Sequence, residues 1–146
     1  MKNIMLVGGG KIGIAIAALL SGTGDYTVTV VDRDAASLSR MPSRNVVTRV
    51  VEIADAASFA REVKGHDIVL SATPYPLTAI VAEAAKTAGA HYLDLTEDVE
   101  STRTIKRLAK GADTAPLAFS ARGAARAGGW VHTGREWQPG ERPCAS

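Results

Sequence analysis

Residues 3–32 read NIMLVGGGKIGIAIAALLSGTGDYTVTVVD, and this stretch decides the fold. The apolar run at 3–7 stops at three consecutive glycines, which is typical of a parallel strand buried on both faces. Residues 12–20 have the length and composition of a helix, and residues 26–31 are rich in the β-branched side chains of a strand. The order strand, glycine loop, helix, strand predicts one βαβ unit.

Strands and helices continue to alternate to about residue 110. We predict further strands at 46–53, 67–72 and 91–95, and further helices at 56–64, 77–88 and 99–110. Asp55 is expected to cap the helix at 56–64, and Gly65 and Gly89 to end this helix and the next. Two prolines in the turn at 73–76 are expected to forbid regular structure there. The alternation predicts an α/β fold with right-handed crossovers, a Rossmann-type doubly wound parallel sheet in a single domain.

The composition is that of one ordinary globular domain. The chain has 146 residues, of which 46% are apolar and 22% charged, with a net charge of +2. It has no basic stripe interleaved with aromatic residues, no Cys/His cluster with metal-ligand spacing and no apolar run of ~18 residues, so we expect no nucleic acid, metal or membrane partner. The single cysteine, Cys144, excludes an internal disulfide framework and indicates a reducing compartment. We expect a cytoplasmic protein.

The glycine loop satisfies the pattern G-x-G-x-x-G in the context that makes it informative, between a strand and a helix. Gly8 is expected to allow the tight turn, Gly10 the approach of a pyrophosphate, and Gly13 the close packing of the helix. N–H groups at the start of the helix, aided by its dipole, would hold the diphosphate. We therefore predict that a dinucleotide cofactor binds Gly8, Gly9, Gly10, Lys11, Ile12 and Gly13.

The end of the second predicted strand bears on the choice of cofactor. Asp32 stands 19 positions after Gly13, where an acidic residue accepts hydrogen bonds from the adenosine ribose. A carboxylate at this place repels a 2′-phosphate and favours NAD. Arg33 follows at once and could bind that phosphate through its planar fork, so NADP is the alternative.

A second group of candidates follows the later strands. Ligands of doubly wound sheets bind outside the carboxyl ends of the strands, so Ala72, Thr73 and Pro74 are expected near the nicotinamide ribose. Tyr75 is a candidate to face the nicotinamide or the substrate, with packing on the loop as the alternative. Thr96 is a similar candidate after the fifth strand, where a helix start is the alternative interpretation.

Residues 120–146 differ from the rest of the chain. They contain both tryptophans and the cysteine but no Lys, Leu, Ile, Met or Phe, and neither a strand nor a helix period. We divide the chain into a dinucleotide-binding domain at 1–119 and an irregular or disordered tail at 120–146. A loss of the natural reading frame near residue 115 is the other interpretation, since Ala, Gly, Arg, Pro and Trp are what GC-rich codons yield out of frame.

The chain resembles the amino-terminal half of the saccharopine dehydrogenase-like family, including its lysine 6-dehydrogenase-type members. Its members open with segments similar to LVGGGKIG and VVDRD. They continue with one similar to GHDIVLSATPYPLTAIVAEAAKTAGAHYLDLTEDV at 65–99, which is the more specific segment. The resemblance covers residues 1–119. It implies cofactor contacts for Gly8, Gly10, Lys11, Ile12, Asp32, Thr73 and Pro74, and a position toward the substrate cleft for Tyr75.

The resemblance implies an amino-acid oxidoreductase that acts on a C–N bond, with nicotinamide carrying the hydride. Family members add a domain that binds substrate and supplies most catalytic groups, and residues 116–122 depart from the family's CGLAPGF-like segment. We therefore expect a truncated form that binds dinucleotide, whose catalytic residues are unknown, and which is inactive alone. Apolar surface bared by the missing domain predicts self-association.

Two other functions stay open. The regulatory domains of potassium-uptake systems are similar over residues 1–34, which would make the chain a non-catalytic nucleotide-sensing module. The segment at 65–99 fits the oxidoreductases better. A domain that folds but binds nothing is the third hypothesis.

Overall fold

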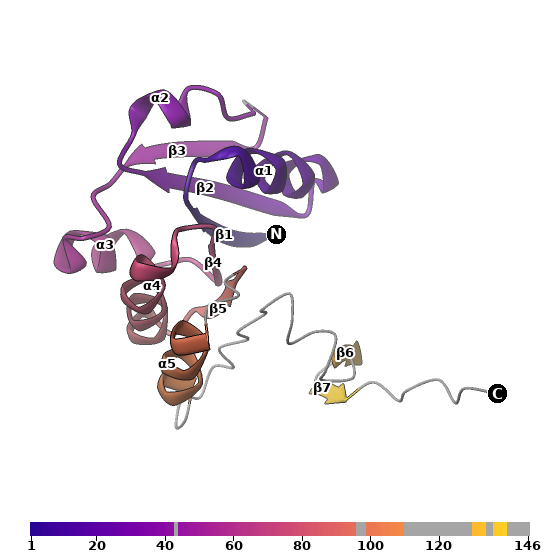
Figure 1. The fold of residues 1–146 in the computed structure, drawn as a ribbon. Helices are drawn as coiled ribbons and strands as arrows, with labels where there is room; N and C mark the ends of the chain where they lie inside the picture. The colour runs from indigo at the N-terminus through magenta and orange to yellow at the C-terminus, as the bar shows by residue number, and fades with distance from the viewer. Residues whose placement is uncertain (43, 96–98, 110–129, 134–135, 140–146) are drawn as a thin grey trace.

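The computed structural model describes residues 1–42, 44–95, 99–109, 130–133 and 136–139. Its main body is a parallel sheet of five strands in the order β3-β2-β1-β4-β5 (Figure 1). The strands are β1 (Lys2–Val7), β2 (Tyr26–Asp32), β3 (Val46–Val50), β4 (Ile68–Ser71) and β5 (His91–Asp94). The helices are α1 (Lys11–Thr23), α2 (Ala35–Leu38), α3 (Ala56–Val63), α4 (Tyr75–Ala88) and α5 (Val99–Ala109).

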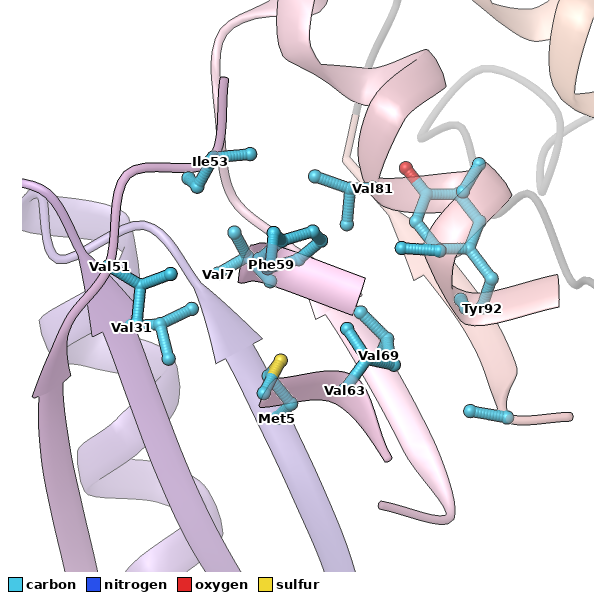
Figure 2. Packing of buried hydrophobic residues seen from close by; sticks show 14 of the residues in the cluster. Met5, Val7, Val31, Val51, Ile53, Phe59, Val63, Val69, Val81 and Tyr92 are labelled. Atoms are coloured by element: carbon cyan, nitrogen blue, oxygen red, sulfur yellow. The ribbon is translucent and has the colours of Figure 1, made fainter. Parts of the chain in front are cut away.

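Alternate residues of the central strand β1 enter two separate cores. Met5 and Val7 belong to the larger core, to which α3, α4 and α5 contribute side chains; Phe59 and Val81 are two of these (Figure 2). Leu6 belongs to the smaller core with residues of α1 and α2. Because side chains of a strand alternate between its two faces, the sheet is covered on both sides. The predicted doubly wound α/β fold is confirmed.

Two of the predicted helix ends are confirmed, at Asp55 and Gly89, whereas α3 ends at Val63, one residue before the expected Lys64. The Asp55 carboxylate accepts a hydrogen bond from the backbone N–H of Ser58 at 3.2 Å and caps α3. Gly89 ends α4 in the left-handed conformation, with φ 70°. The third strand is shorter than expected and stops at Val50, because its partner strand β2 ends at Asp32. The Asp32 carbonyl accepts the last hydrogen bond between them, from the backbone N–H of Val51.

The expectation that two prolines forbid regular structure at 73–76 is wrong. Pro74 is the residue that precedes α4, and the helix begins at Tyr75 with Pro76 in its first turn. The first N–H groups of a helix have no partner within it, so a residue without an N–H costs little there. The prolines therefore mark the start of α4.

One short helix was not expected at all. Helix α2 is a single turn that begins after Asp34, whose carboxylate accepts hydrogen bonds from the backbone N–H groups of Ala36 and Ser37. Four residues are too few to show a helical period in the sequence. Its start is visible only as a capping aspartate.

The tail contains two short strands where the composition indicated no regular structure. Strands β6 (Trp130–Thr133) and β7 (Glu136–Pro139) pair antiparallel. The other predictions for residues 120–146 fall outside the described residues, as does the expected end of the last helix at residue 110. None of the helices that the structure describes combines the length and the apolar character needed to cross a membrane.

The larger core makes a direct prediction for stability. Phe59 is fully buried, so Phe59→Ala is expected to lower the free energy of unfolding by about 3–5 kcal/mol through lost burial and a cavity. Leu19→Ala is the control, because Leu19 is 72% exposed on α1 and its loss should change stability by no more than about 0.5 kcal/mol. Urea unfolding followed by circular dichroism measures both; equal effects would contradict the assigned core.

Candidate functional site

Gly8 and Gly13 are required by the crossing of α1 over the end of β1. Gly8 has φ +109°, a backbone conformation that residues with a side chain rarely adopt. A Cβ there would lie 2.8 Å from the carbonyl oxygen of Ala72. A Cβ on Gly13 would overlap the carbonyl oxygen of Gly8. The loop is therefore confined between α1 and the end of β4, and any side chain at either position would push these elements apart.

Gly10 is a glycine for a different reason. Its backbone is extended, with φ −70°, and a Cβ built on it meets no atom within 4 Å. Neither the fold nor the backbone conformation requires a glycine here. Gly10 lines an open cleft, and its missing side chain leaves the backbone accessible from that cleft.

The start of α1 carries positive potential toward the same cleft. Gly10 is its N-cap and offers no side-chain acceptor, and its first turn has no acidic residue. The first N–H groups of a helix lack partners within it, and the helix dipole adds partial positive charge. An anion fits this place, because neither a capping oxygen nor a carboxylate of that turn already satisfies the N–H groups.

Asp32 ties the end of β2 to the glycine loop. Its Oδ2 accepts a hydrogen bond from the Gly9 N–H at 2.6 Å, and its Oδ1 accepts one from the Asp34 N–H at 2.9 Å. A Cβ on Gly9 would lie 3.3 Å from Asp32 Oδ2. Each carboxylate oxygen has a second lone pair, so the half-buried carboxylate is held in orientation and can still accept hydrogen bonds from a ligand.

A cleft of about 520 Å³ runs along the carboxyl ends of the strands. The glycine loop contributes Gly8 and Gly10. What we name the β2–β3 end is lined by Asp32, Arg33, Asp34, Ser37, Glu52, Ile53 and Ala54. The β4 end is lined by Ala72, Thr73, Pro74 and Leu77.

The β4 end is fixed by hydroxyl groups beneath it. Ser71 Oγ and Thr73 Oγ1 lie 2.9 Å apart and share a hydrogen bond, and Ser71 is buried. On the neighbouring strand β5, the buried Tyr92 donates its hydroxyl to the carbonyl of Thr78 at 3.5 Å. Burial and the nearby Asp94 carboxylate raise the pKa of Tyr92 far above its ordinary value, so the phenol stays protonated and neutral.

The structure brings seven of the predicted site residues to this one cleft: Gly8, Gly10, Asp32, Arg33, Ala72, Thr73 and Pro74. Four others of the loop do not line it: Gly9, Lys11, Ile12 and Gly13. Of these, Gly9 and Gly13 make the backbone contacts described above, and Ile12 is 60% exposed. Tyr75, 63% exposed at the start of α4, is not among the lining residues, and Thr96 lies outside the described part of the chain.

Six lining residues were missed from the sequence: Asp34, Ser37, Glu52, Ile53, Ala54 and Leu77. A signal existed for three of them. Residues 52–54 follow β3 at the same edge of the sheet as residues 72–74 follow β4, and the same argument about strand ends applies to both. In the described part of the chain, no group of three His, Cys, Asp or Glu side chains could hold a metal ion.

These features define a class of protein. A helix start open to anions, an acidic strand end and a cleft across the carboxyl ends of β1, β2 and β4 are those of a dinucleotide-binding Rossmann domain. Residues 4–125 match the sequence model of the saccharopine dehydrogenase NADP binding domain. The chain belongs to the saccharopine dehydrogenase family through this NAD(P)-binding domain, as its sequence resemblance predicted. A search of the curated proteins finds no match.

Solved structures share the fold at low sequence identity. Saccharopine dehydrogenase (L-Glu forming) from Saccharomyces cerevisiae aligns with a TM-score of 0.64 and 20% identity, over 70% of this chain but 23% of its own. The NAD(P)-binding domain of an exopolyphosphatase-related protein from Archaeoglobus fulgidus aligns with a TM-score of 0.66 and 13% identity, over 86% and 92% of the two chains. A Rossmann-fold NAD(P)-binding family protein from Shigella flexneri aligns with a TM-score of 0.61 and 19% identity, over 73% and 60%. This chain therefore spans about a quarter of the yeast enzyme.

The crossing of α1 over the loop can be tested with two glycines of the same helix. Gly13→Ala is expected to lower the free energy of unfolding by about 1–3 kcal/mol, because its Cβ must displace the Gly8 carbonyl. Gly22→Ala, whose Cβ meets no atom within 4 Å, should raise stability by about 0.5–1 kcal/mol through helix propensity. Urea unfolding of both variants provides the measurement. A Gly13→Ala variant as stable as the wild type would contradict the close crossing of α1 over the loop.

Proposed function

We propose that this domain holds NAD in the cleft and presents it for hydride transfer at the C–N bond of an amino-acid substrate. The observation that carries the proposal is Gly10: neither packing nor backbone conformation requires a glycine there, and its open side faces the cleft. A ligand that approaches the backbone closely explains it. The start of α1 supplies unsatisfied N–H groups beside it, which suit a diphosphate.

The β2–β3 end suits the adenosine. Asp32 would accept hydrogen bonds from the ribose hydroxyls with the lone pairs that Gly9 and Asp34 leave open. Arg33, on the same end, would lie beside the adenine or ribose. Lys11 and Ile12, exposed at the start of α1, would contribute backbone N–H groups rather than side chains.

The β4 end suits the nicotinamide. Ala72 and Pro74 are small or rigid enough for a ring to approach closely, and Thr73 Oγ1, held by Ser71, would bind the adjacent ribose. Tyr75 and Thr96 are proposed to face the substrate. The nicotinamide supplies the hydride chemistry, and these residues orient it.

Proton transfer would need groups from elsewhere. None of the described residues lining the β4 end is titratable in the ordinary pH range: they are Ala72, Thr73, Pro74 and Leu77. In an amine oxidation the carbon gives up a hydride to the nicotinamide, and a base must take a proton from the amine nitrogen. We therefore propose that the described residues bind and orient the cofactor, and that the catalytic acid and base lie outside them.

The lack of a titratable side chain among the described residues that line the β4 end also favours one alternative to the oxidoreductase function. A nucleotide-sensing module needs a binding cleft but no acid or base, and the described β4 end has that character. The two functions differ in the chemistry that follows binding. Reduction of NAD on addition of an amino acid, seen in the absorbance of the reduced nicotinamide, would favour the oxidoreductase. Binding without reduction is expected of both functions, because the described lining of the β4 end supplies no acid or base.

Calorimetric titration of the chain with NADH tests the cofactor site. Gly10→Ala is expected to weaken binding at least about tenfold, because its methyl group occupies the approach to the helix N–H groups and costs hydrogen bonds to a charged ligand. Its free energy of unfolding should stay within about 1 kcal/mol of the wild type, since its Cβ meets no atom and only the N-cap preference for glycine over alanine is lost. Gly22→Ala serves as the control and should bind normally. Absence of NADH binding by the folded wild-type chain would overturn the proposal.

A further inference from the structure

We propose that Asp34 is a second specificity-determining residue of the cofactor site, and that together with Asp32 it selects a dinucleotide without a 2′-phosphate. The inference rests on the proposed function and deepens it, since it names a further residue that sets the preference for NAD over NADP. The matching family model is described as an NADP binding domain, so a preference for NAD would set this chain apart from that description. The choice follows instead from charges and donors at the β2–β3 end.

Asp34 is held close to the ribose-binding carboxylate. Its backbone N–H donates to Asp32 Oδ1 at 2.9 Å, and both residues line the cleft. The end of β2 and the first turn of α2 thus present two carboxylates on nearly adjacent backbone. A phosphate on the ribose 2′-oxygen would enter next to both of them.

The Asp34 carboxylate already occupies the donors that such a phosphate would need. It accepts hydrogen bonds from the Ala36 N–H at 3.0 Å, the Ser37 N–H at 3.1 Å and the Ser37 hydroxyl at 2.7 Å. Arg40 Nη2 in turn donates to Ser37 Oγ at 3.3 Å. The Asp34 carboxylate therefore fills the place of an anion at the start of α2. A 2′-phosphate here could not bind these donors and would be repelled by the negative charge of the carboxylate.

The net charge at this end of the cleft is negative. Three of its lining residues are carboxylates (Asp32, Asp34 and Glu52), against one guanidinium, Arg33. The hydrogen bond from the Ser37 hydroxyl, with those from the backbone, lowers the pKa of Asp34, so its charge persists at neutral pH. A phosphate monoester brings nearly two more negative charges. Arg33 can offset only part of this repulsion.

Asp34→Asn tests the role of the charge without removing the helix cap, because asparagine caps helices as well as aspartate does. Titrations of the full chain with NADH and NADPH give a ratio of dissociation constants. The wild type should prefer NADH, and Asp34→Asn should reduce this preference about fivefold, mainly by tighter binding of NADPH. An unchanged ratio would overturn the proposal.

Asp55→Asn is the matched control. Asp55 also caps a helix, its pKa is also lowered by bonds to Ser58, and it does not line the cleft. Its variant should leave the ratio of dissociation constants unchanged. If Asp55→Asn shifted the ratio as much as Asp34→Asn, a general charge effect would replace the proposed local one.

Salt provides an independent readout. Asp34 is exposed, so added salt should screen its repulsion and narrow the wild-type preference for NADH; the ratio in Asp34→Asn should depend less on salt. Equal binding of NADH and NADPH by the wild type would reject this inference and leave the cofactor site intact. Binding of neither dinucleotide would reject the proposed function itself.

Discussion

The contact between Gly13 of α1 and the carbonyl of Gly8 is the constraint on which the rest of the site depends. It brings the start of α1 down onto the loop, while the Ala72 carbonyl closes the other side of Gly8. These two contacts fix the backbone of the loop, and in this conformation the Gly9 N–H donates to Asp32 at the end of β2. One helix crossing thus sets the position of the anion-binding helix start, the acidic strand end and the β4 turn relative to each other.

The three glycines of the motif divide between structure and binding. Gly8 and Gly13 have no room for a side chain, whereas Gly10 has open space around it. Loss of the first two would damage the fold before it damaged binding. A methyl group at Gly10 would leave the packing intact and obstruct only the cleft, so the fold can survive without the cofactor function.

The sequence predicted the parts whose signals are local and strong. The strand, glycine loop, helix and acidic strand end at 3–32 are recognised by composition and spacing alone, as is the Asp55 cap. The start of α4 was misread, because Pro74 and Pro76 look like breakers unless the helix start is known. Helix α2 was missed because its four residues show no helical period. The lining residues at 52–54 were missed because their place depends on where β3 stops, and the pairing of β3 with β2 decides that end. Such ends are set by tertiary contacts rather than by local preference.

Cofactor choice within a shared fold rests on features that the fold does not determine. The family description refers to NADP, yet the glycine loop and the sheet would hold the diphosphate of either dinucleotide equally well. The discrimination comes from exposed side chains after β2, which packing does not constrain. At position 34 the fold needs only a cap, and asparagine or serine would serve. An aspartate there also adds a negative charge, beside a carboxylate that already disfavours the 2′-phosphate. One carboxylate can thus cap α2 and, as we propose, disfavour a 2′-phosphate in the cleft.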